Sequence, residues 1–286
     1  MLWLISCVLL AGATAAGAAF EIVGIGARAW ALGSAFSAGV DDAGAAWFNP
    51  AANGRIKKFQ VGTTHALLYP GLEETLSLNG LAVAAPVGRG GIQLGLSTLN
   101  FPGWREQAGV LGYGRGVHPR FSVGGNLRSR GWKTTGLSHR SWSVDLGGIY
   151  EVGWIGSHAY LRLGWVLSNI NRANDSEGGY AAGKTPRGMI LAGSLQMGSQ
   201  EILIDIERRG GVTEMRVGYE AKSHSLGGAA FRVGANSFSS DWEAGELNAG
   251  LGHSWKQWHL DYVYTYPLRV TGLGGMHGFS ISYRRR

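Results

Sequence analysis

The feature of this sequence that most limits its fold is an alternation of apolar and polar residues that repeats along most of the chain. In the segment HRSWSVDLGGIYEV, the apolar residues Trp142, Val144 and Leu146 alternate with Ser143 and Asp145. Successive side chains of a β-strand point to opposite faces of a sheet, so this period of two predicts a strand with one apolar and one polar face. The same period recurs in EMRVGYEAK, QWHLDYVYTYP and HGFSISY.

Fourteen segments carry this alternation, and an even number of strands is what a closed outer-membrane barrel requires. They lie near residues 57–68, 74–86, 90–99, 105–115, 119–130, 139–151, 157–169, 187–197, 200–208, 213–222, 225–236, 245–255, 257–266 and 275–284. Short and long connections broadly alternate between them, as in barrels with short periplasmic turns and longer outer loops. The connections expected to be long are 99–105, 130–139, 169–187, 236–245 and 266–275.

A soluble β-sandwich would also contain many short strands. The polar face favours a membrane barrel instead, because Asp145, Arg216 and Asn236 share it with many glycines and would line a lumen. Aromatic residues recur near the expected strand ends, as in the girdles of transmembrane barrels. We therefore predict an all-β chain, with a transmembrane antiparallel barrel of about 14 strands over residues 57–286, located in the bacterial outer membrane.

The first nineteen residues are expected to be a signal peptide. The segment LWLISCVLLAGA forms a short apolar core, and ATAAGAA offers small residues for cleavage. The alternatives are a lipoprotein acylation site at Cys7 and a buried N-terminal strand or helix. Beyond this region, we find no run of about 18 apolar residues, which excludes a helical membrane protein.

The segment from residue 20 to 56 contains a G-x-G-x-x-A motif, which raises the possibility of a nucleotide-binding loop. Such a loop requires alternating strands and helices after it, and none is indicated here. Small residues instead predict a compact segment that packs into a narrow space. We expect Asp42 and Asn49 to cap short turns, with Pro50 first in the second turn and Gly54 at its end.

No residue pattern indicates an enzyme, a catalytic residue, a cofactor or a metal site. His253 and His259 are too isolated for a zinc site, and the chain has no G-x-S-x-G elbow. The net charge of +7 could suggest nucleic acid as a partner, but export argues against it. Basic rims suit the head groups of anionic lipid or lipopolysaccharide equally well, so we expect outer-membrane lipid and lipopolysaccharide as partners and no nucleic acid.

Two motifs carry a resemblance to a known family. The first is GARAWALGSAFSAGVDDAGAAWFNPAA near the N-terminus, and the second is LDYVYTYPLRVTGLGGMHGFSISYRR at the C-terminus. Together they resemble the PorV/PorQ family of outer-membrane barrels, which is related to the FadL/TodX transporters of hydrophobic compounds. The matching N-terminal residues include Gly26, Arg28, Gly33, Phe36, Asp41, Asp42, Asn49, Pro50 and Ala51.

The C-terminal motif bears on how such a chain is inserted into the membrane. In the family, a terminal aromatic residue usually marks the substrate of the barrel-insertion machinery, and Arg286 stands at that position here. We therefore assign the strand signal to Phe279, Ile281 and Tyr283, and we expect the insertion machinery as a partner.

The resemblance implies a fourteen-stranded barrel in which residues 20–56 sit in the lumen as a hatch, hinged by glycines such as Gly26 and Gly33. FadL-type members move apolar molecules, whereas PorV and PorQ members assist type IX protein secretion. Because this chain is short for a FadL-type transporter, we expect a PorV/PorQ-type barrel that handles or passes a hydrophobic molecule or a secreted-protein segment, with the hatch as a gate. A hydrophobic small molecule or secretion-system proteins are the partners that this interpretation implies. A FadL-like transporter of fatty acids or hydrocarbons and a sealed scaffold are the alternatives.

Overall fold

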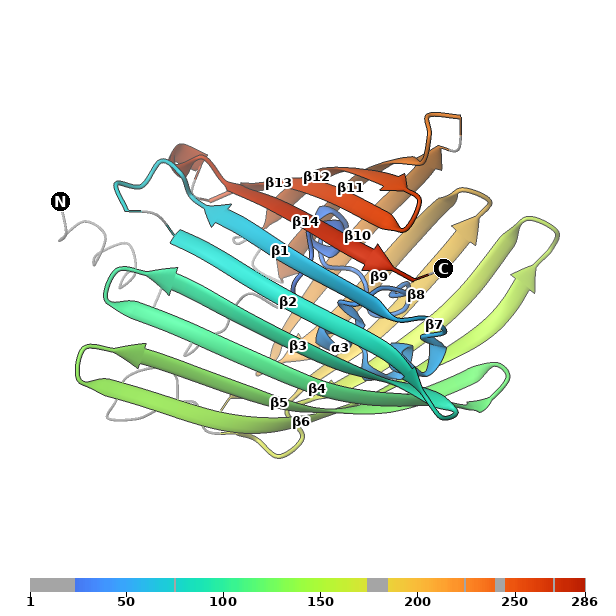
Figure 1. Ribbon diagram of the computed structural model, residues 1–286, viewed down its shortest axis with the longest axis horizontal. Coiled ribbons are helices and arrows are strands. Elements are labelled where there is room, and N and C mark those ends of the chain that lie inside the picture. The colour runs from blue at the N-terminus through green and yellow to red at the C-terminus, as the bar shows by residue number, and fades with distance from the viewer. Residues whose placement is uncertain are drawn as a thin grey trace.

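The structure, a computed structural model, describes residues 24–74, 76–173, 185–223, 225–239, 245–269 and 271–285. Fourteen antiparallel strands form one closed barrel, in which each strand pairs with its neighbours in the chain and β1 closes the ring on β14 (Figure 1). The strands are β1 (Gln60–Leu68), β2 (Leu76–Val87), β3 (Gly90–Phe101), β4 (Trp104–His118), β5 (Phe121–Thr134), β6 (Leu137–Ile155), β7 (Ala159–Ser168), β8 (Gly188–Met197), β9 (Gln200–Arg209), β10 (Val212–Ser223), β11 (Ala229–Ser239), β12 (Glu246–Trp255), β13 (Trp258–Pro267) and β14 (Met276–Arg284).

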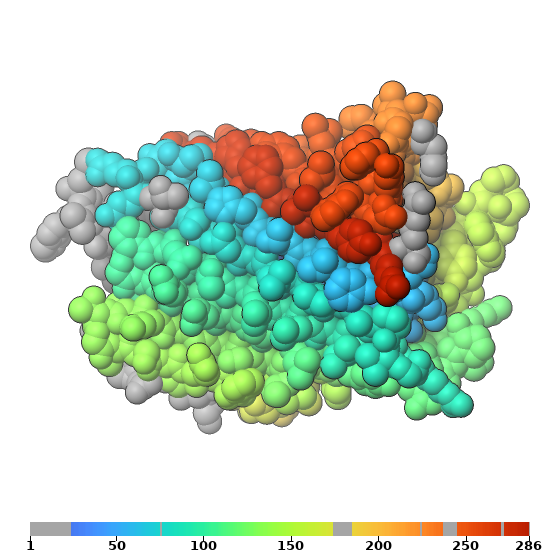
Figure 2. Space-filling model, in the orientation of Figure 1, coloured from blue at the N-terminus to red at the C-terminus, as the bar shows by residue number. Residues whose placement is uncertain are grey.

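The outer wall of the barrel is apolar along most of its height. Large side chains remain exposed there, such as Leu94 on β3, Leu111 on β4 and Ile204 on β9. Figure 2 shows one side of this wall, formed by the N-terminal strands in cyan and green with β13 and β14 in red. An apolar surface of this extent suits lipid rather than water, and the closed ring pairs every strand edge. The fold is therefore that of a bacterial outer-membrane barrel, as the alternation predicts.

No helix in the described part of the chain is both long enough and apolar enough to cross a membrane.

The two ends of the barrel differ in the length of their connections. At one end the turns are tight, at residues 88–89, 119–120, 198–199 and 256–257. The other end carries the longer connections, including those that follow β1 and β7. Short turns face the periplasm in transmembrane barrels, so the first end is the periplasmic end and the second is the outer end.

The predicted length is wrong for two of the connections that we expected to be long. The connections predicted at 99–105 and 130–139 are two-residue turns at 102–103 and 135–136. The strands β3 to β6 continue beyond the apolar belt of the wall, where their outward residues become polar. The alternation of apolar and polar residues therefore ends before the strands do.

Residues 24–56 lie inside the barrel, where they form what we call the plug (Figure 1, in blue). It contains two short helices, α2 (Ala27–Ala31) and α3 (Ala45–Phe48), and a 3-10 helix, η1 (Pro50–Arg55). The short helix η2 (Thr271–Leu273) belongs to an outer loop. Residues 1–23, which include the expected signal peptide, lie outside the described residues.

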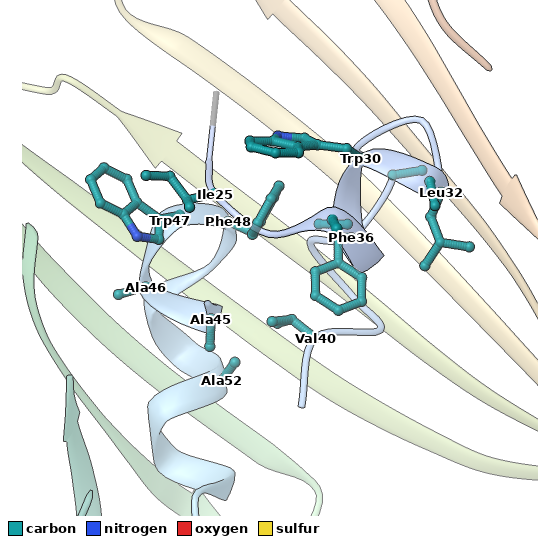
Figure 3. Packing of buried hydrophobic residues seen from close by; sticks show 14 of the residues in the cluster. Ile25, Trp30, Leu32, Phe36, Val40, Ala45, Ala46, Trp47, Phe48 and Ala52 are labelled. Carbon is teal, nitrogen blue, oxygen red and sulfur yellow. The ribbon is translucent and has the colours of Figure 1, made fainter. Parts of the chain in front are cut away.

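The plug provides most of the apolar core of the molecule. Figure 3 shows Trp30, Leu32, Phe36, Trp47 and Phe48 of the plug; all five are buried and belong to one apolar cluster. Several alanines of the plug have no exposed surface at all. Small side chains let its backbone pass close to the inner wall, which is the packing that the composition of this segment predicts.

Candidate functional site: the plugged lumen

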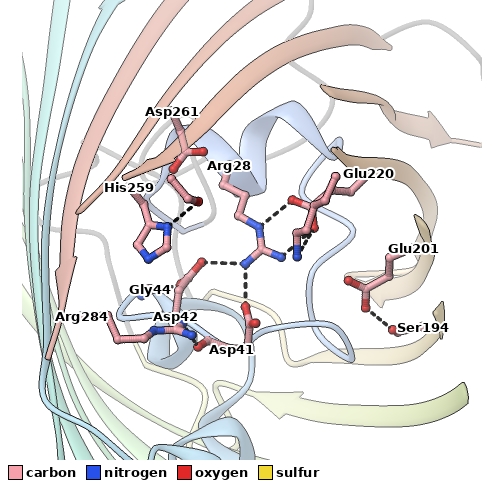
Figure 4. Close-up of polar contacts among 12 residues, drawn as sticks. Arg28, Asp41, Asp42, Gly44, Ser194, Glu201, Glu220, His259, Asp261 and Arg284 are labelled. Atoms are coloured by element: carbon pink, nitrogen blue, oxygen red, sulfur yellow. Dashed lines mark hydrogen bonds and ion pairs between the residues drawn. The ribbon is translucent and has the colours of Figure 1, made fainter. Parts of the chain in front are cut away.

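The plug is tied to the wall by an arginine at its start. In α2, the Arg28 guanidinium donates to both carboxylate oxygens of Glu220 on β10, over 2.9 and 3.0 Å (Figure 4). It also donates to Asp41 at 2.5 Å and to Asp42 at 3.4 Å, both in the plug. We call these four residues the Arg28 cluster. They bring together three positions of the N-terminal motif that are up to 14 residues apart in the chain.

Further charged residues on the strands of the barrel wall pair with the Arg28 cluster. Glu220 accepts a third hydrogen bond, from Arg232 of β11 at 2.6 Å, and the Lys222 ammonium lies 2.8 Å from the Glu220 carboxylate. Arg232 in turn donates to Asp261 of β13 at 2.8 Å. Each buried charge therefore has an opposite partner, which is the condition under which charges are tolerated away from water.

The two aspartates of the Arg28 cluster respond differently to the same arginine. Partial desolvation opposes ionisation of Asp41, but the charges of Arg28 and Lys222 prevail and hold its pKa well below the usual range. The Asp41 side chain is 45% exposed, so solvent screens part of this attraction. Burial raises the pKa of Asp42, and the charge of Arg28 only partly offsets it, while the charge of Asp41 adds to the rise.

Phe36 packs against the Arg28 guanidinium and helps to hold it in place. The Arg28 guanidinium carbon lies 5.1 Å from the centroid of the Phe36 ring, within the range of a cation–π contact. The Phe36 ring meets the Phe48 ring edge to face at 5.4 Å. The motif phenylalanine is thus a packing residue that fixes the position of the arginine.

Asn49 joins the second half of the plug to the wall. Its side-chain oxygen accepts a hydrogen bond from the Ala51 amide at 3.0 Å and caps η1, in which Pro50 is the first residue. Its side-chain amide donates to the carbonyl oxygens of Ser37 at 2.9 Å and Gly148 at 3.3 Å. The expected cap is confirmed, but the residue also bridges two plug segments and β6.

Of the other two expected turn residues, one is confirmed and one needs correction. Asp42 caps the turn that leads into α3, because its carboxylate accepts from the Gly44 amide at 2.8 Å. Gly54 does not end η1, because the helix continues through Arg55 and Gly54 lies inside it. Here the wall sets the path of the chain, since Gly54 passes directly over the backbone of Arg115 on β4.

Glycines on the inner wall let the plug backbone touch the strands. A Cβ at Gly124 would fall on the Pro50 carbonyl, and one at Gly147 would fall on the Asn49 side-chain oxygen. At the other end of the plug, a Cβ at Gly234 would overlap the amide of Gly33, a motif glycine with a φ of 62°. The other motif glycine, Gly26, precedes α2 with a φ of 139°. This track of wall glycines shows where the plug is seated.

A cavity of about 100 Å³ lies between the plug and the outer end of the barrel, and we call it the vestibule. Apolar residues from the plug and from β2 to β4 form one part of its lining, which we call the apolar side: Ile25, Trp47, Phe48, Leu78, Leu99 and Ala108. The charged residues come from β4 to β10, with the apolar Val166 and Ile190 among them, and we call them the charged side: Glu106, Arg128, Arg130, Asp145, Arg209 and Arg216.

Aromatic rings line the lumen above the apolar side of the vestibule. Phe101 stacks on Trp104 with ring centroids 6.1 Å apart, and Trp104 stacks on Trp132 at 5.0 Å. These residues lie at the outer ends of β3, β4 and β5. Phe101 continues the apolar side of the vestibule towards the outer mouth, whereas the Trp104 indole N–H donates to Glu106 of the charged side over 3.0 Å.

The residues of the expected C-terminal signal share one face of the last strand. Phe279 and Ile281 of β14 are exposed on the outer wall, and the Tyr283 ring lies 5.2 Å from that of Trp258 on β13. This placement agrees with a lipid-facing strand end. Within the described residues, no group of histidine, cysteine and acidic side chains could hold a metal ion.

Solved structures with the same architecture are transporters of the outer membrane. The toluene transporter TodX of Pseudomonas putida matches with a TM-score of 0.69 and 10% identity, over 93% of this chain and 99% of that chain. TbuX, the toluene transporter of Ralstonia pickettii, gives 0.63 and 12% over 93% and 99%, and a FadL homologue of Pseudomonas aeruginosa gives 0.58 and 13% over 94% and 99%. No protein-family model and no curated protein matches the sequence.

The comparisons therefore show that the chain has the fold of FadL/TodX-type barrels. The low identities restrict this statement to the fold. Of the two related groups named from the motifs, the comparisons support the FadL/TodX side, and they do not support the PorV/PorQ assignment.

Proposed function

We propose that this chain carries small hydrophobic compounds through the outer membrane, as a FadL/TodX-type barrel without enzymatic activity. The vestibule is the observation that carries the proposal. Its apolar side includes Leu78, Leu99 and Trp47, and stacked aromatic rings lie between the vestibule and the outer mouth. An apolar surface favours the binding of apolar molecules and disfavours water and ions.

The size of the vestibule limits what it can hold while the plug is in place. Apolar cavities of roughly 150 Å³ accept a benzene molecule in other proteins. The vestibule, at about 100 Å³, has room for a molecule of this order only after a small adjustment of its lining. Passage beyond it requires the plug to shift, and in this proposal the plug is the gate.

The test is uptake of the apolar dye 1-N-phenylnaphthylamine by cells whose outer membrane otherwise excludes it. Replacing Leu78 and Leu99 by Asn keeps the side-chain size and removes the apolar surface of the vestibule. Burying a leucine-sized apolar surface is worth about 1.5–3 kcal/mol, so we expect uptake to fall on the order of tenfold. Leu96→Asn is the matched control, because Leu96 faces outward on the same strand as Leu99.

A second candidate is the secretion role of PorV/PorQ-type barrels. The short outer turns favour it, because the hairpins β3–β4 and β5–β6 end in two residues each and offer little chain for ligand capture. The N-terminal motif residues support the same group. In this role the dye would not enter through the parent protein, and the two Asn substitutions would leave uptake at the background rate.

A further inference from the structure

Three basic side chains gather on the outer wall where β4, β5 and β6 rise above the apolar belt. Arg105 of β4 and Lys133 of β5 are directly paired across the two strands. Arg140 of β6 is paired with Gly131, two residues before Lys133 in β5. All three side chains are exposed. We call these three residues the basic patch.

The side chains of the basic patch point away from the lumen. Their chain neighbours Glu106, Trp132 and Ser141 are buried and face inward, so the alternation of the strands places the patch on the outside. The Arg140 side chain lies across β5, because its Nε would be 3.6 Å from a Cβ at Gly131. Gly131 thus leaves room for Arg140 to approach the other two cations.

This arrangement is unfavourable unless an anion is present. Like charges directly opposite each other on neighbouring strands are destabilising. No ion pair joins Arg105, Lys133 or Arg140 to any residue in the described ranges. The acidic residue adjacent to Arg105 in β4 is Glu106, and its side chain points into the lumen. Within the described ranges nothing in the chain neutralises the three cations, and an external anion would do so.

The height of the basic patch above the belt indicates which anion is available there. On the outward face of β6, Arg140 is two residues closer to the outer end of the barrel than Trp142. The apolar Leu146 lies four residues further towards the periplasmic end than Trp142. Two residues of a strand span about 7 Å, which places the cations just above an interfacial tryptophan. On the outer side of the membrane this is the level of the lipid head groups.

We propose that the basic patch binds the phosphate groups of an outer-leaflet glycolipid of the lipid A type. Arginine binds phosphate oxygens through two N–H groups in one plane, and lysine adds a mobile point charge. One phosphate between Arg105 and Lys133, within reach of Arg140, would neutralise the repulsion described above. The acyl chains would then lie against the apolar outer wall that the same strands provide.

The experiment is a titration of the detergent-solubilised full-length protein with bisphosphorylated lipid A, followed by native mass spectrometry. We expect the triple variant Arg105→Gln, Lys133→Gln, Arg140→Gln to bind about 100-fold more weakly, given the usual contribution of a basic side chain at an anionic surface. Lys133→Gln alone is expected to weaken binding several-fold. A heat-dependent shift on denaturing gels confirms that each variant is a folded barrel.

The matched control removes the same charge elsewhere on the barrel. Arg89→Gln, Arg115→Gln, Arg120→Gln alters three exposed cations at the periplasmic ends of strands β2 to β5, and it should bind lipid A as the parent does. Equal loss in both triple variants would overturn the proposal, as would equal binding of lipid A without phosphates. Displacement of lipid A by millimolar inorganic phosphate alone would assign the patch to free phosphate and overturn the lipid assignment.

Discussion

At the level of single residues, Asn49 shows how one side chain can serve several parts of the plug. It is fully buried, caps η1 through its oxygen, and donates through its amide to Ser37 and Gly148. A cap of this kind can be anticipated from the Asn-Pro pair in the sequence. The two amide contacts cannot, because they join residues 12 and 99 positions away.

Replacing Asn49 by Ala removes the cap and leaves two carbonyls without their donor. We expect the plug to lose on the order of 2–4 kcal/mol of local stability, the sum of a cap and of a buried unsatisfied group. Asn49→Ser is the informative comparison, because serine restores the cap alone. Hydrogen exchange at residues 45–56 measures the effect, and equal exchange in the Ala and Ser variants would show that the cap contributes little.

The pKa shifts in the Arg28 cluster predict how the stability of the plug changes with pH. The depressed pKa of Asp41 means that its pairing with Arg28 contributes above its unfolded pKa of about 3.9 and is lost only as pH falls through the folded value. The raised pKa of Asp42 has the opposite effect, because keeping this carboxyl ionised at neutral pH lowers the stability of the folded plug. In the parent protein, protection of the plug from hydrogen exchange should therefore persist down to about pH 5.

Arg28→Gln should invert this dependence on pH. Without the guanidinium, Glu220 keeps Arg232 and Lys222 as partners, but Asp41 and Asp42 lose their shared cation, and protonation relieves the repulsion between these two carboxylates. We expect weaker protection of the plug at pH 7 and a recovery as the pH is lowered to about 5. Arg55→Gln, which removes a different plug arginine that pairs with Glu151, is the control. A variant whose plug is uniformly loose at both pH values would contradict the assigned role of the cluster.

At the level of elements, the strands were predictable and their partners inside the lumen were not. A period of two identifies all fourteen strands because one face meets lipid and the other does not. It fails where β5 and β6 rise beyond the membrane, since the outward residues there are polar, as at the cross-strand pair Lys133 and Ser138. The wall glycines could not be interpreted from sequence, because the meaning of Gly124 or Gly147 depends on which backbone approaches it.

Neighbouring glycines of β5 give a matched test of the seat of the plug. Gly124→Ala would place a methyl group on the Pro50 carbonyl, whereas a Cβ at Gly125 would make two ordinary van der Waals contacts, with Leu146 at 3.5 Å and the Asp145 carbonyl oxygen at 3.6 Å. Overpacking of this kind typically costs about 1–3 kcal/mol. We expect Gly124→Ala to raise exchange in residues 45–56 and to increase dye uptake, while Gly125→Ala leaves both unchanged. A displaced plug without more uptake would argue against the plug as a gate.

At the level of the whole molecule, both proposals depend on which end of the barrel faces outward. The transport proposal has the ligand approach the vestibule from the end with long connections. The lipid proposal requires the basic patch to lie at the level of the outer leaflet. The orientation assigned here rests on the short turns, which transmembrane barrels direct towards the periplasm.

Cysteine labelling tests this orientation directly, because Cys7 is the single cysteine in the sequence. In a Cys7→Ser background, Thr135→Cys lies in the exposed β5–β6 turn, and Arg89→Cys lies in the exposed β2–β3 turn at the opposite end. A membrane-impermeant maleimide should label Thr135→Cys on intact cells and Arg89→Cys only after the outer membrane is permeabilised. The reverse pattern would place the basic patch in the periplasmic leaflet, where lipid A is absent, and would turn the vestibule towards the cell interior. Both proposals would then fail together, although the barrel and its plug would stand as described.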